Sequence, residues 1–169
     1  LLPMGIGVGL HLGDLMLGII GSEDRMQGAV VSDDVNLAAR LEGLTRIYGS
    51  SVTLSELTFT QLKDTHRYMH RFVDKVSVKG KKKPVSVYEI YDGDPHEVAV
   101  LKEETKGEFE AGLKLYYDRQ FSEASVKFSQ VLQKNPEDKA ARIYLERSAR
   151  YMVKGVPEDW IGVETLTQK

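Results

Sequence analysis

The stretch "VVSDDVNLAARLEGL", residues 30–44, decides how the first half of the chain folds. Its polar start, followed by apolar residues at helical spacing, predicts a helix from Asp33 to Tyr48. Ser32 or Asp33 can cap the N-terminus of this helix, because their side chains accept hydrogen bonds from main-chain N–H groups. Gly49 follows the last turn and indicates the C-terminal cap.

The predicted helix carries two polar residues, Asn36 and Arg40, beside its apolar stripe. They are four residues apart and therefore share one face of the helix. The stripe itself consists of Leu37, Leu41, Leu44 and Tyr48. A position at the edge of a buried stripe can face a cleft or a partner subunit. Residue chemistry alone also allows a simpler interpretation, in which Asn36 is solvated and Arg40 pairs with a nearby carboxylate.

The composition is that of a globular protein of one domain or slightly more, with 169 residues, of which 41% are hydrophobic and 28% are charged. The net charge of −2 provides no basic field, so no nucleic-acid partner is expected. The absence of cysteine excludes disulfides and thiolate metal sites and fits a reducing compartment. Because the sequence begins inside the apolar run "LLPMGIGVGL", we expect part of a domain to precede residue 1.

Residues 1–20 predict two apolar strands, joined around "HLGD" by a hairpin or a tight bend at Gly13 and Asp14. Their near-continuous apolar character favours strands that are covered on both faces. The glycines among them do not fit the G-x-G-x-x-G spacing of dinucleotide-binding folds, and instead indicate bends or close approach of the backbone. Residues 21–28 are polar and predict a loop.

After the helix, the pattern predicts a strand in "SVTLSE", a short helix capped by Ser55, and two strands joined by a Gly/Lys/Pro turn over residues 67–92. Strand signals stop at Asp92–Pro95. We therefore expect two domains, a sheet domain over residues 1–94 and a helical segment with a C-terminal tail over residues 95–169.

Residues 97–154 show helical periodicity in three segments, separated by "DRQ" and "NPED". The stretch "FEAGLKLYYDRQFSEASVKFSQVLQKNP" resembles a tetratricopeptide repeat (TPR). The residues at the spacing of that repeat are Gly112, Phe121, Ala124, Phe128 and Pro136. A single unit is not stable alone, so we expect it to lean on the first domain, with Trp160 as the candidate contact. It can be a purely structural hairpin or a surface for a partner peptide.

Residues 5–92 resemble the C-terminal half of a class III nucleotidyl cyclase catalytic domain. The matching pieces, in order, are "GLHLGDLMLGIIG", "SDDVNLAARLE", "SVTLSE" and "VDKVSVKGKKKPVSVYEIYD". Several pieces in the same order are specific, whereas "VNLAAR" alone is not. The resemblance implies an α+β fold. The chain would contain the C-terminal half of a ferredoxin-like cyclase sheet domain, which is therefore partial. An all-α TPR-like hairpin and a third helix would follow it.

The resemblance also implies an activity for the parent protein. Cyclases of this class convert a nucleoside triphosphate to a cyclic nucleotide and pyrophosphate for intracellular signalling, and we expect ATP rather than GTP as the substrate. They use two divalent metal ions, Mg or Mn, at sites between two catalytic domains, so a homodimer is expected. The family's catalytic Asn and Arg match Asn36, which would orient the ribose, and Arg40, which would stabilise charge on the phosphates. We expect a cytoplasmic location, as part of a bacterial protein that can also carry a membrane anchor.

The sequence departs from the family's pattern in two ways. The family's metal-binding aspartates and the Lys that reads adenine belong to the first half of the domain, which this chain lacks. We therefore expect no bound metal and no activity from the chain alone. At the base-recognition position, the family carries Asp or Thr. The chain has Ala29 there, a degenerate residue whose side chain has no hydrogen-bonding group. Lys79, in the turn "KGKKK", can contact the triphosphate or belong to a solvated hairpin tip.

Ala29 also favours an alternative function, a non-catalytic cyclase-like dimerisation module whose TPR-like segment binds a protein partner. Among the other polar residues, His11 is expected to pack or to lie at the surface. Asp14, Asp33 and Asp34 are interpreted as turn and cap residues rather than metal ligands. An open sheet edge is expected to make the chain dimerise, exchange strands or aggregate.

Overall fold

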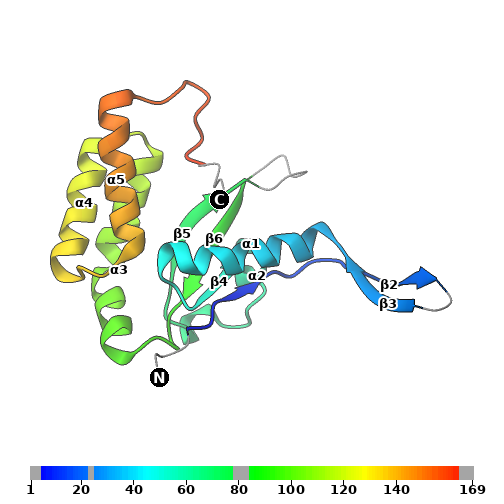
Figure 1. The fold of residues 1–169 in the computed structure, drawn as a ribbon. Helices are drawn as coiled ribbons and strands as arrows, with labels where there is room; N and C mark the ends of the chain where they lie inside the picture. Colours follow the sequence, from blue (N-terminus) through cyan, green and yellow to red (C-terminus); the bar gives the residue numbers. More distant parts are fainter. Residues whose placement is uncertain (1–4, 23–24, 78–83, 164–169) are drawn as a thin grey trace.

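The computed structural model describes residues 5–22, 25–77 and 84–163. Within these residues, a four-stranded sheet lies at the centre, a two-stranded hairpin projects from it, and three long helices stand beside it (Figure 1). The central strands, in spatial order, are β1 (Val8–Leu10), β4 (Val52–Ser55), β6 (Val85–Ile90) and β5 (His70–Val76). β1 and β4 are parallel, and the other neighbours are antiparallel. This arrangement confirms the α+β class.

The hairpin predicted within residues 1–20 is wrong. β1 pairs with β4, whereas β2 (Met16–Ser22) pairs with β3 (Arg25–Val31) in a separate sheet. Residues 11–15 therefore connect two sheets instead of turning back on themselves. The glycine turn signal is local, but strand pairing depends on partners that lie far away in the sequence.

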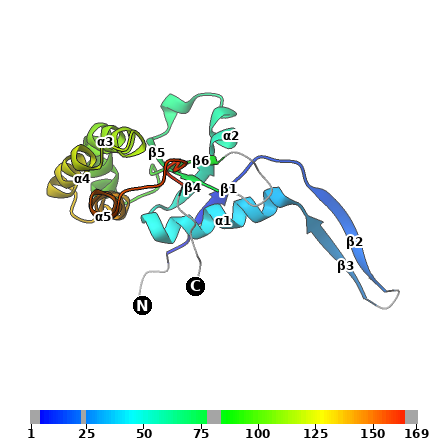
Figure 2. The same cartoon turned by 90° about the horizontal axis from the view of Figure 1, so that it is seen from above.

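Two further expectations for this region are wrong. Residues 21–28 are not a loop, since β2 continues to Ser22 and β3 begins at Arg25. The apolar strands are not covered on both faces in this chain, because Val8 and Leu10 on β1 are 39% and 43% exposed. Figure 2 shows the hairpin β2–β3 reaching away from the rest of the chain.

Helix α1 (Asp33–Tyr48) has the bounds that the sequence predicts. Its N-cap is Ser32, whose hydroxyl accepts a hydrogen bond of 3.0 Å from the main-chain N–H of Asp34. Gly49 ends the helix in the left-handed region, with φ of 67°, and its N–H donates to the carbonyl of Thr45. The predicted apolar stripe is buried, and its members are Leu37, Leu41, Leu44 and Tyr48.

Helix α1 packs directly against β1, and two glycines permit this close approach. A β-carbon on Gly9 would lie 2.2 Å from the main-chain nitrogen of Glu42 and 2.3 Å from the carbonyl oxygen of Ala38. A β-carbon on Gly7 would lie 2.1 Å from the hydroxyl oxygen of Thr45. The prediction that glycines mark close backbone approach is therefore confirmed at these two positions.

The segment after α1 follows the sequence prediction. β4 leads into the short helix α2 (Glu56–Thr60), whose N-cap Ser55 accepts a hydrogen bond from the N–H of Thr58. A 3-10 turn at Thr65–Arg67 then precedes β5. β5 and β6 form the predicted antiparallel pair.

Three helices follow the sheet, α3 (His96–Tyr117), α4 (Phe121–Lys134) and α5 (Lys139–Lys154), in the segments that the sequence predicts. Figures 1 and 2 show them as a bundle beside β5, one of the two outer strands of the four-stranded sheet. A small residue is needed where α3 crosses α4, because a β-carbon on Gly112 would lie 2.9 Å from the ring of Phe128. None of the helices in the described ranges combines the length and apolar character that a membrane span requires.

One hydrophobic core runs through both the sheet and the helices. From the first half of the chain it contains Leu37, Leu41, Leu44, Tyr48, Val73, Val76 and Val87, and from the helices Phe109, Leu113, Tyr116, Phe121, Ala124, Phe128, Val131, Ala140, Ala141 and Tyr144. The expectation that Trp160 joins the two parts is wrong. Its ring packs against Tyr116, Phe121 and Tyr151, with centroids 5.3 to 5.5 Å apart, so it closes the helical segment on itself.

Candidate active site

Asn36 and Arg40 lie one turn apart in the first half of α1, where Asn36 is exposed and Arg40 is half-buried. Nη1 of Arg40 donates a hydrogen bond of 2.6 Å to the main-chain carbonyl of Ser77, the residue that follows β5. This partner is a carbonyl and not the carboxylate that the simpler interpretation of the sequence assumes. A guanidinium carries five N–H donors, so one bond fixes its position and leaves donor capacity for an anion.

The start of α1 is held to the sheet by His11, which follows β1. Nδ1 of its ring lies 2.7 Å from the hydroxyl of Ser55, and Nε2 lies 3.2 Å from a carboxylate oxygen of Asp34. The side chain of His11 is only 2% exposed, which agrees with the expected packing role. Because Asp34 is two residues before Asn36, this contact also fixes the turn of helix that presents Asn36. The two partners of His11 lie 23 and 44 residues away along the chain, so no local sequence pattern reveals this contact.

A carboxylate, an imidazole and a hydroxyl are hydrogen-bonded in series in Asp34, His11 and Ser55, as in a catalytic triad. The serine is not accessible, however. Ser55 is fully buried, and its hydroxyl serves as the N-cap of α2. A nucleophile must reach its substrate, so these residues join three elements of the fold and do not form a hydrolytic site.

The other site residues predicted from the sequence lie elsewhere. Ala29 lies on β3, opposite Gly18, in the projecting hairpin. Lys79 falls outside the described residues. Nowhere in residues 5–22, 25–77 and 84–163 do three or more His, Cys, Asp or Glu side chains form a group that could hold a metal ion. The described part of the chain therefore brings Asn36 and Arg40 together and offers no ligand set for a metal.

Comparisons with known proteins place the chain among its relatives. The profile of the adenylate and guanylate cyclase catalytic domain matches residues 2–91, more than half of the chain. The chain belongs to the adenylate and guanylate cyclase family. A terminal-differentiation-specific adenylate cyclase of Dictyostelium discoideum is 34% identical over 142 residues, which is 83% of this chain and 7% of that relative. An adenylate cyclase of Anabaena cylindrica is 36% identical over 88 residues, 52% of this chain and 18% of the relative.

The similarity to the Dictyostelium cyclase is longer than the cyclase region itself, so it includes part of the helical segment. Both relatives are much larger proteins, and the chain spans less than a fifth of either one. Among solved structures, the adenylyl cyclase CyaB from P. aeruginosa is 30% identical, covers 46% of this chain and 38% of its own, and superimposes with a TM-score of 0.37.

Buried charges join the cyclase region to the helical segment. The Arg71 guanidinium on β5 donates from Nε to Glu89 on β6, and both residues are 0% exposed. Lys102 on α3 donates to Glu89 at 3.0 Å and to Asp94 at 2.7 Å. Burial alone would lower the pKa of Arg71, but Glu89 and Asp138 raise it above its ordinary value, so Arg71 keeps its charge.

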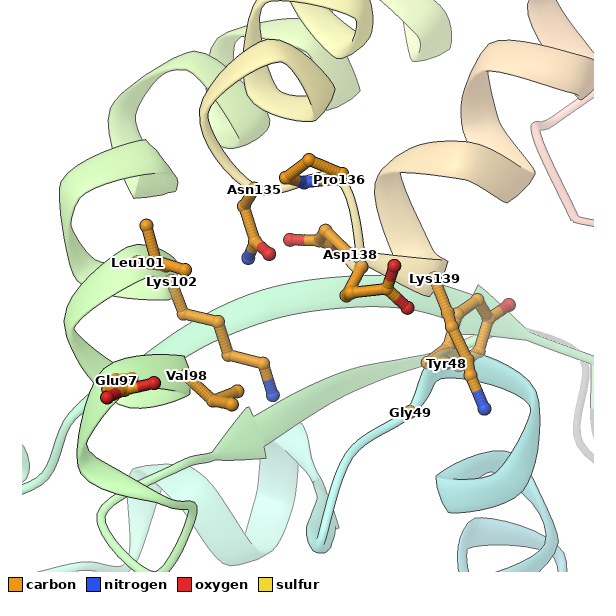
Figure 3. A pocket seen from close by; sticks show the side chains of 11 residues that line it. Tyr48, Gly49, Glu97, Val98, Leu101, Lys102, Asn135, Pro136, Asp138 and Lys139 are labelled. Atoms are coloured by element: carbon orange, nitrogen blue, oxygen red, sulfur yellow. The ribbon is translucent and has the colours of Figure 1, made fainter.

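A cavity of about 180 Å³ lies at the same junction, between the end of α1, the first turns of α3 and the turn before α5 (Figure 3). Val98 and Leu101 form apolar wall, and the side chains of Lys102 and Asn135 point into the space. The cavity is lined there by Tyr48, the last residue of α1, and by its C-cap Gly49, at the opposite end of the helix from Asn36. The cavity is therefore part of the junction and is separate from the Asn36–Arg40 flank of the cyclase domain.

Proposed function

We propose that this chain supplies the Asn36–Arg40 pair to the active site of a nucleotidyl cyclase. The parent enzyme would convert a nucleoside triphosphate, ATP in preference to GTP, to a cyclic nucleotide and pyrophosphate for intracellular signalling. The observation that carries the proposal is the placement of these two side chains. They lie on one face of a capped helix, within the part of the chain that matches the cyclase family. The Arg40 guanidinium is already positioned by its hydrogen bond to Ser77.

Each residue has a distinct role in this proposal. The amide of Asn36 is both donor and acceptor, which suits it to orient the ribose hydroxyls. The Arg40 guanidinium would hold phosphate oxygens through parallel hydrogen bonds while negative charge develops on them. Its place in the second turn of α1 brings it near the positive end of the helix dipole, which favours an anion.

We infer that another part of the parent protein binds the catalytic metal ions. Two divalent ions, Mg or Mn, would activate the ribose 3′-oxygen and neutralise the phosphates. The described residues hold no fitting carboxylate group, so we infer that the first half of the catalytic domain provides the ligands. The chain alone is accordingly proposed to be inactive, and the complete site to form in a homodimer in the cytoplasm.

Activity of the parent protein with a substituted Arg40 tests this proposal. Arg40→Ala should lower kcat by about 10²- to 10³-fold, the range for loss of one donor to developing charge. Arg40→Lys should restore only part of the rate, because an ammonium keeps the charge but lacks the planar fork. Arg46→Ala is the matched control, since Arg46 lies on the same helix and is 82% exposed. Full activity in Arg40→Ala, with an unchanged thermal melt, would exclude the catalytic role.

A second candidate function is a non-catalytic dimerisation module, in which the TPR-like segment of residues 95–169 recruits a protein partner. The presence of Ala29 at the base-recognition position favours it, because a methyl group makes no hydrogen bond to a base. Nucleotide binding by the parent protein separates the two functions. Saturable binding of a triphosphate with metal supports the enzyme, and failure to bind it supports the module.

A further inference from the structure

Helix α1 is tied to strand β5 at two points. In its second turn, Arg40 donates to the carbonyl of Ser77, just beyond the strand. At its end, the hydroxyl of Tyr48 donates to the carboxylate of Asp74, within the strand. Asp74 and Ser77 are three residues apart on one extended segment, so the position of Asp74 governs where the Ser77 carbonyl meets Arg40.

The carboxylate of Asp74 is shared with the helical segment. Besides Tyr48, it accepts a hydrogen bond of 2.7 Å from the hydroxyl of Tyr144 on α5 and one of 3.1 Å from the hydroxyl of Tyr117 on α3. Arg147, also on α5, lies 3.5 Å away. Asp74 is only 1% exposed, and its carboxylate also accepts a hydrogen bond of 2.7 Å from the main-chain N–H of Lys75, so its partners are protein groups and not solvent. A buried carboxylate depends on such donors, which makes this an obligatory contact between α1, β5, α3 and α5.

A β-bulge aims Asp74 at this cluster. Phe72 pairs with Tyr88 and Asp74 with Val87, so Val73 is an extra residue in β5. The hydroxyl of Tyr144 lies 3.0 Å from the carbonyl of Val73 as well as bonding Asp74. The single proton of this phenol serves one of the two oxygens at a time, so Tyr144 on α5 lies against both the bulge residue Val73 and its neighbour Asp74.

The phenols remain donors at physiological pH. Burial, reinforced by the negative charge of Asp74, raises the pKa of Tyr48, Tyr117 and Tyr144 above its ordinary value. The ring of Tyr117 has Nζ of Lys75 at 4.3 Å from its centroid, and Gly162 lies so close to its edge that a β-carbon there would be 2.3 Å from a ring carbon.

We propose that Asp74, Tyr117 and Tyr144 are positioning residues for Arg40, through which the helices α3 and α5 set the competence of the cyclase site. This inference rests on the proposed function for its catalytic consequence, but not for its structural part. A shift of α5 against the sheet would move the bulge, the Ser77 carbonyl and then the guanidinium. None of the three residues would touch the nucleotide.

The structural part is tested on the 169-residue chain with the variant Tyr144→Phe, which removes one hydroxyl and keeps the ring. The readout is the signal of the Arg40 Nη–H group that donates to the Ser77 carbonyl, in a proton–nitrogen correlation spectrum, assigned by its loss in Arg40→Lys. We expect this signal to shift and its hydrogen exchange to accelerate by about tenfold, as the Ser77 contact loosens. Tyr117→Phe, which removes the weaker bond, should cause a smaller change in the same direction.

Tyr91→Phe is the matched control for these variants. Tyr91 is also fully buried, and its hydroxyl also joins the sheet to α3, at 2.6 Å from Glu103, but it does not contact Asp74. The Arg40 signal should stay at its wild-type position in this variant. An Arg40 signal that is unchanged in Tyr144→Phe, or that moves equally in Tyr91→Phe, overturns the inference.

The catalytic part is tested in the parent protein. Because Arg40 is proposed to act on charge that develops in the transition state, Tyr144→Phe should lower kcat and leave KM nearly unchanged. A displacement near 1 Å corresponds to a loss of up to about 10²-fold. Tyr91→Phe should keep the wild-type kcat. If the parent forms no cyclic nucleotide at all, the proposed function fails, while the spectrum still decides whether α5 positions Arg40.

Discussion

The guanidinium of Arg71, on β5, donates two hydrogen bonds to the carboxylate of Asp138, at 2.7 Å from Nη1 and 3.1 Å from Nη2. Both residues are almost entirely buried. Asp138 also caps α5, since the same carboxylate accepts from the N–H of Ala141 at 3.0 Å. The guanidinium lies 4.0 Å from the centroid of the Phe109 ring on α3. A single ion pair thus connects the sheet, α3 and the start of α5.

Asp138→Asn should strongly destabilise the chain. It leaves the buried Arg71 charge with Glu89 as its remaining carboxylate partner, and breaking a buried pair typically costs about 3–5 kcal/mol. Urea unfolding at neutral pH measures the change. Glu42→Gln is the control, because Glu42 pairs with the exposed Arg46 at 3.6 Å and should change the free energy of unfolding by less than about 0.5 kcal/mol. Equal effects of the two substitutions would contradict the importance of the buried pair.

The same carboxylate should make stability depend on pH. Burial would raise the pKa of Asp138, but Arg71 lowers it below the ordinary value of 3.8. A depressed folded-state pKa stabilises the fold fully above 3.8, and this stabilisation disappears as the pH falls through the folded-state pKa. The difference in unfolding free energy between wild type and Asp138→Asn should therefore shrink in acid. A difference that is the same at neutral pH and well below 3.8 would rule this out.

Gly9→Ala should displace α1 from β1. The new methyl group would meet the backbone of Glu42 and Ala38, which cannot rotate away as a side chain can. Overpacking of this kind costs about 1–3 kcal/mol or more, so the melting temperature should fall. Gly5→Ala is the control, because a β-carbon there meets no atom within 4 Å. A Gly9→Ala protein that melts with the wild type would show that the helix and strand are less closely packed than described.

Ala29→Thr should increase base selectivity in the parent enzyme. The added hydroxyl restores a hydrogen-bonding group at the position where the family carries Asp or Thr, and one such bond corresponds to about 10- to 100-fold discrimination. The measurement is the ratio of kcat/KM for ATP and GTP. Ala149→Thr, at an exposed position on α5, is the control. Unchanged selectivity in a folded Ala29→Thr enzyme would remove Ala29 from the proposed base-recognition site.

Helix α1 could be predicted almost residue by residue, because its signals are local. Ser32 and Gly49 mark its ends by their own chemistry, and the apolar stripe repeats at the helical period. The shared face of Asn36 and Arg40 follows from their spacing alone. The contact of Arg40 with Ser77 could not be foreseen, since the two are 37 residues apart.

The strand partners and the junction depend on distant residues, and there the sequence was a poor guide. The turn signal near Gly13 suggested a hairpin, but β1 found its partner in β4. Arg71 and Asp74 were not among the residues that the sequence singled out. A usable signal was present, because they lie among Phe72, Val73 and Val76 in one strand, and a charge in a buried strand requires a partner. The opposite charges and tyrosines of α3 and α5 were the candidates for that partner.

The place of the helical bundle beside β5 has a consequence for the solubility of the protein. β5 is one of the two outer strands of the sheet, and the hydroxyl of Tyr144 on α5 lies 3.0 Å from the carbonyl of Val73 on it. An uncovered outer strand is a template onto which another chain can add a strand of its own. The bundle therefore acts as a shield against fibril-like association, and a protein shortened after β6 would be prone to precipitate although its cyclase residues were all retained.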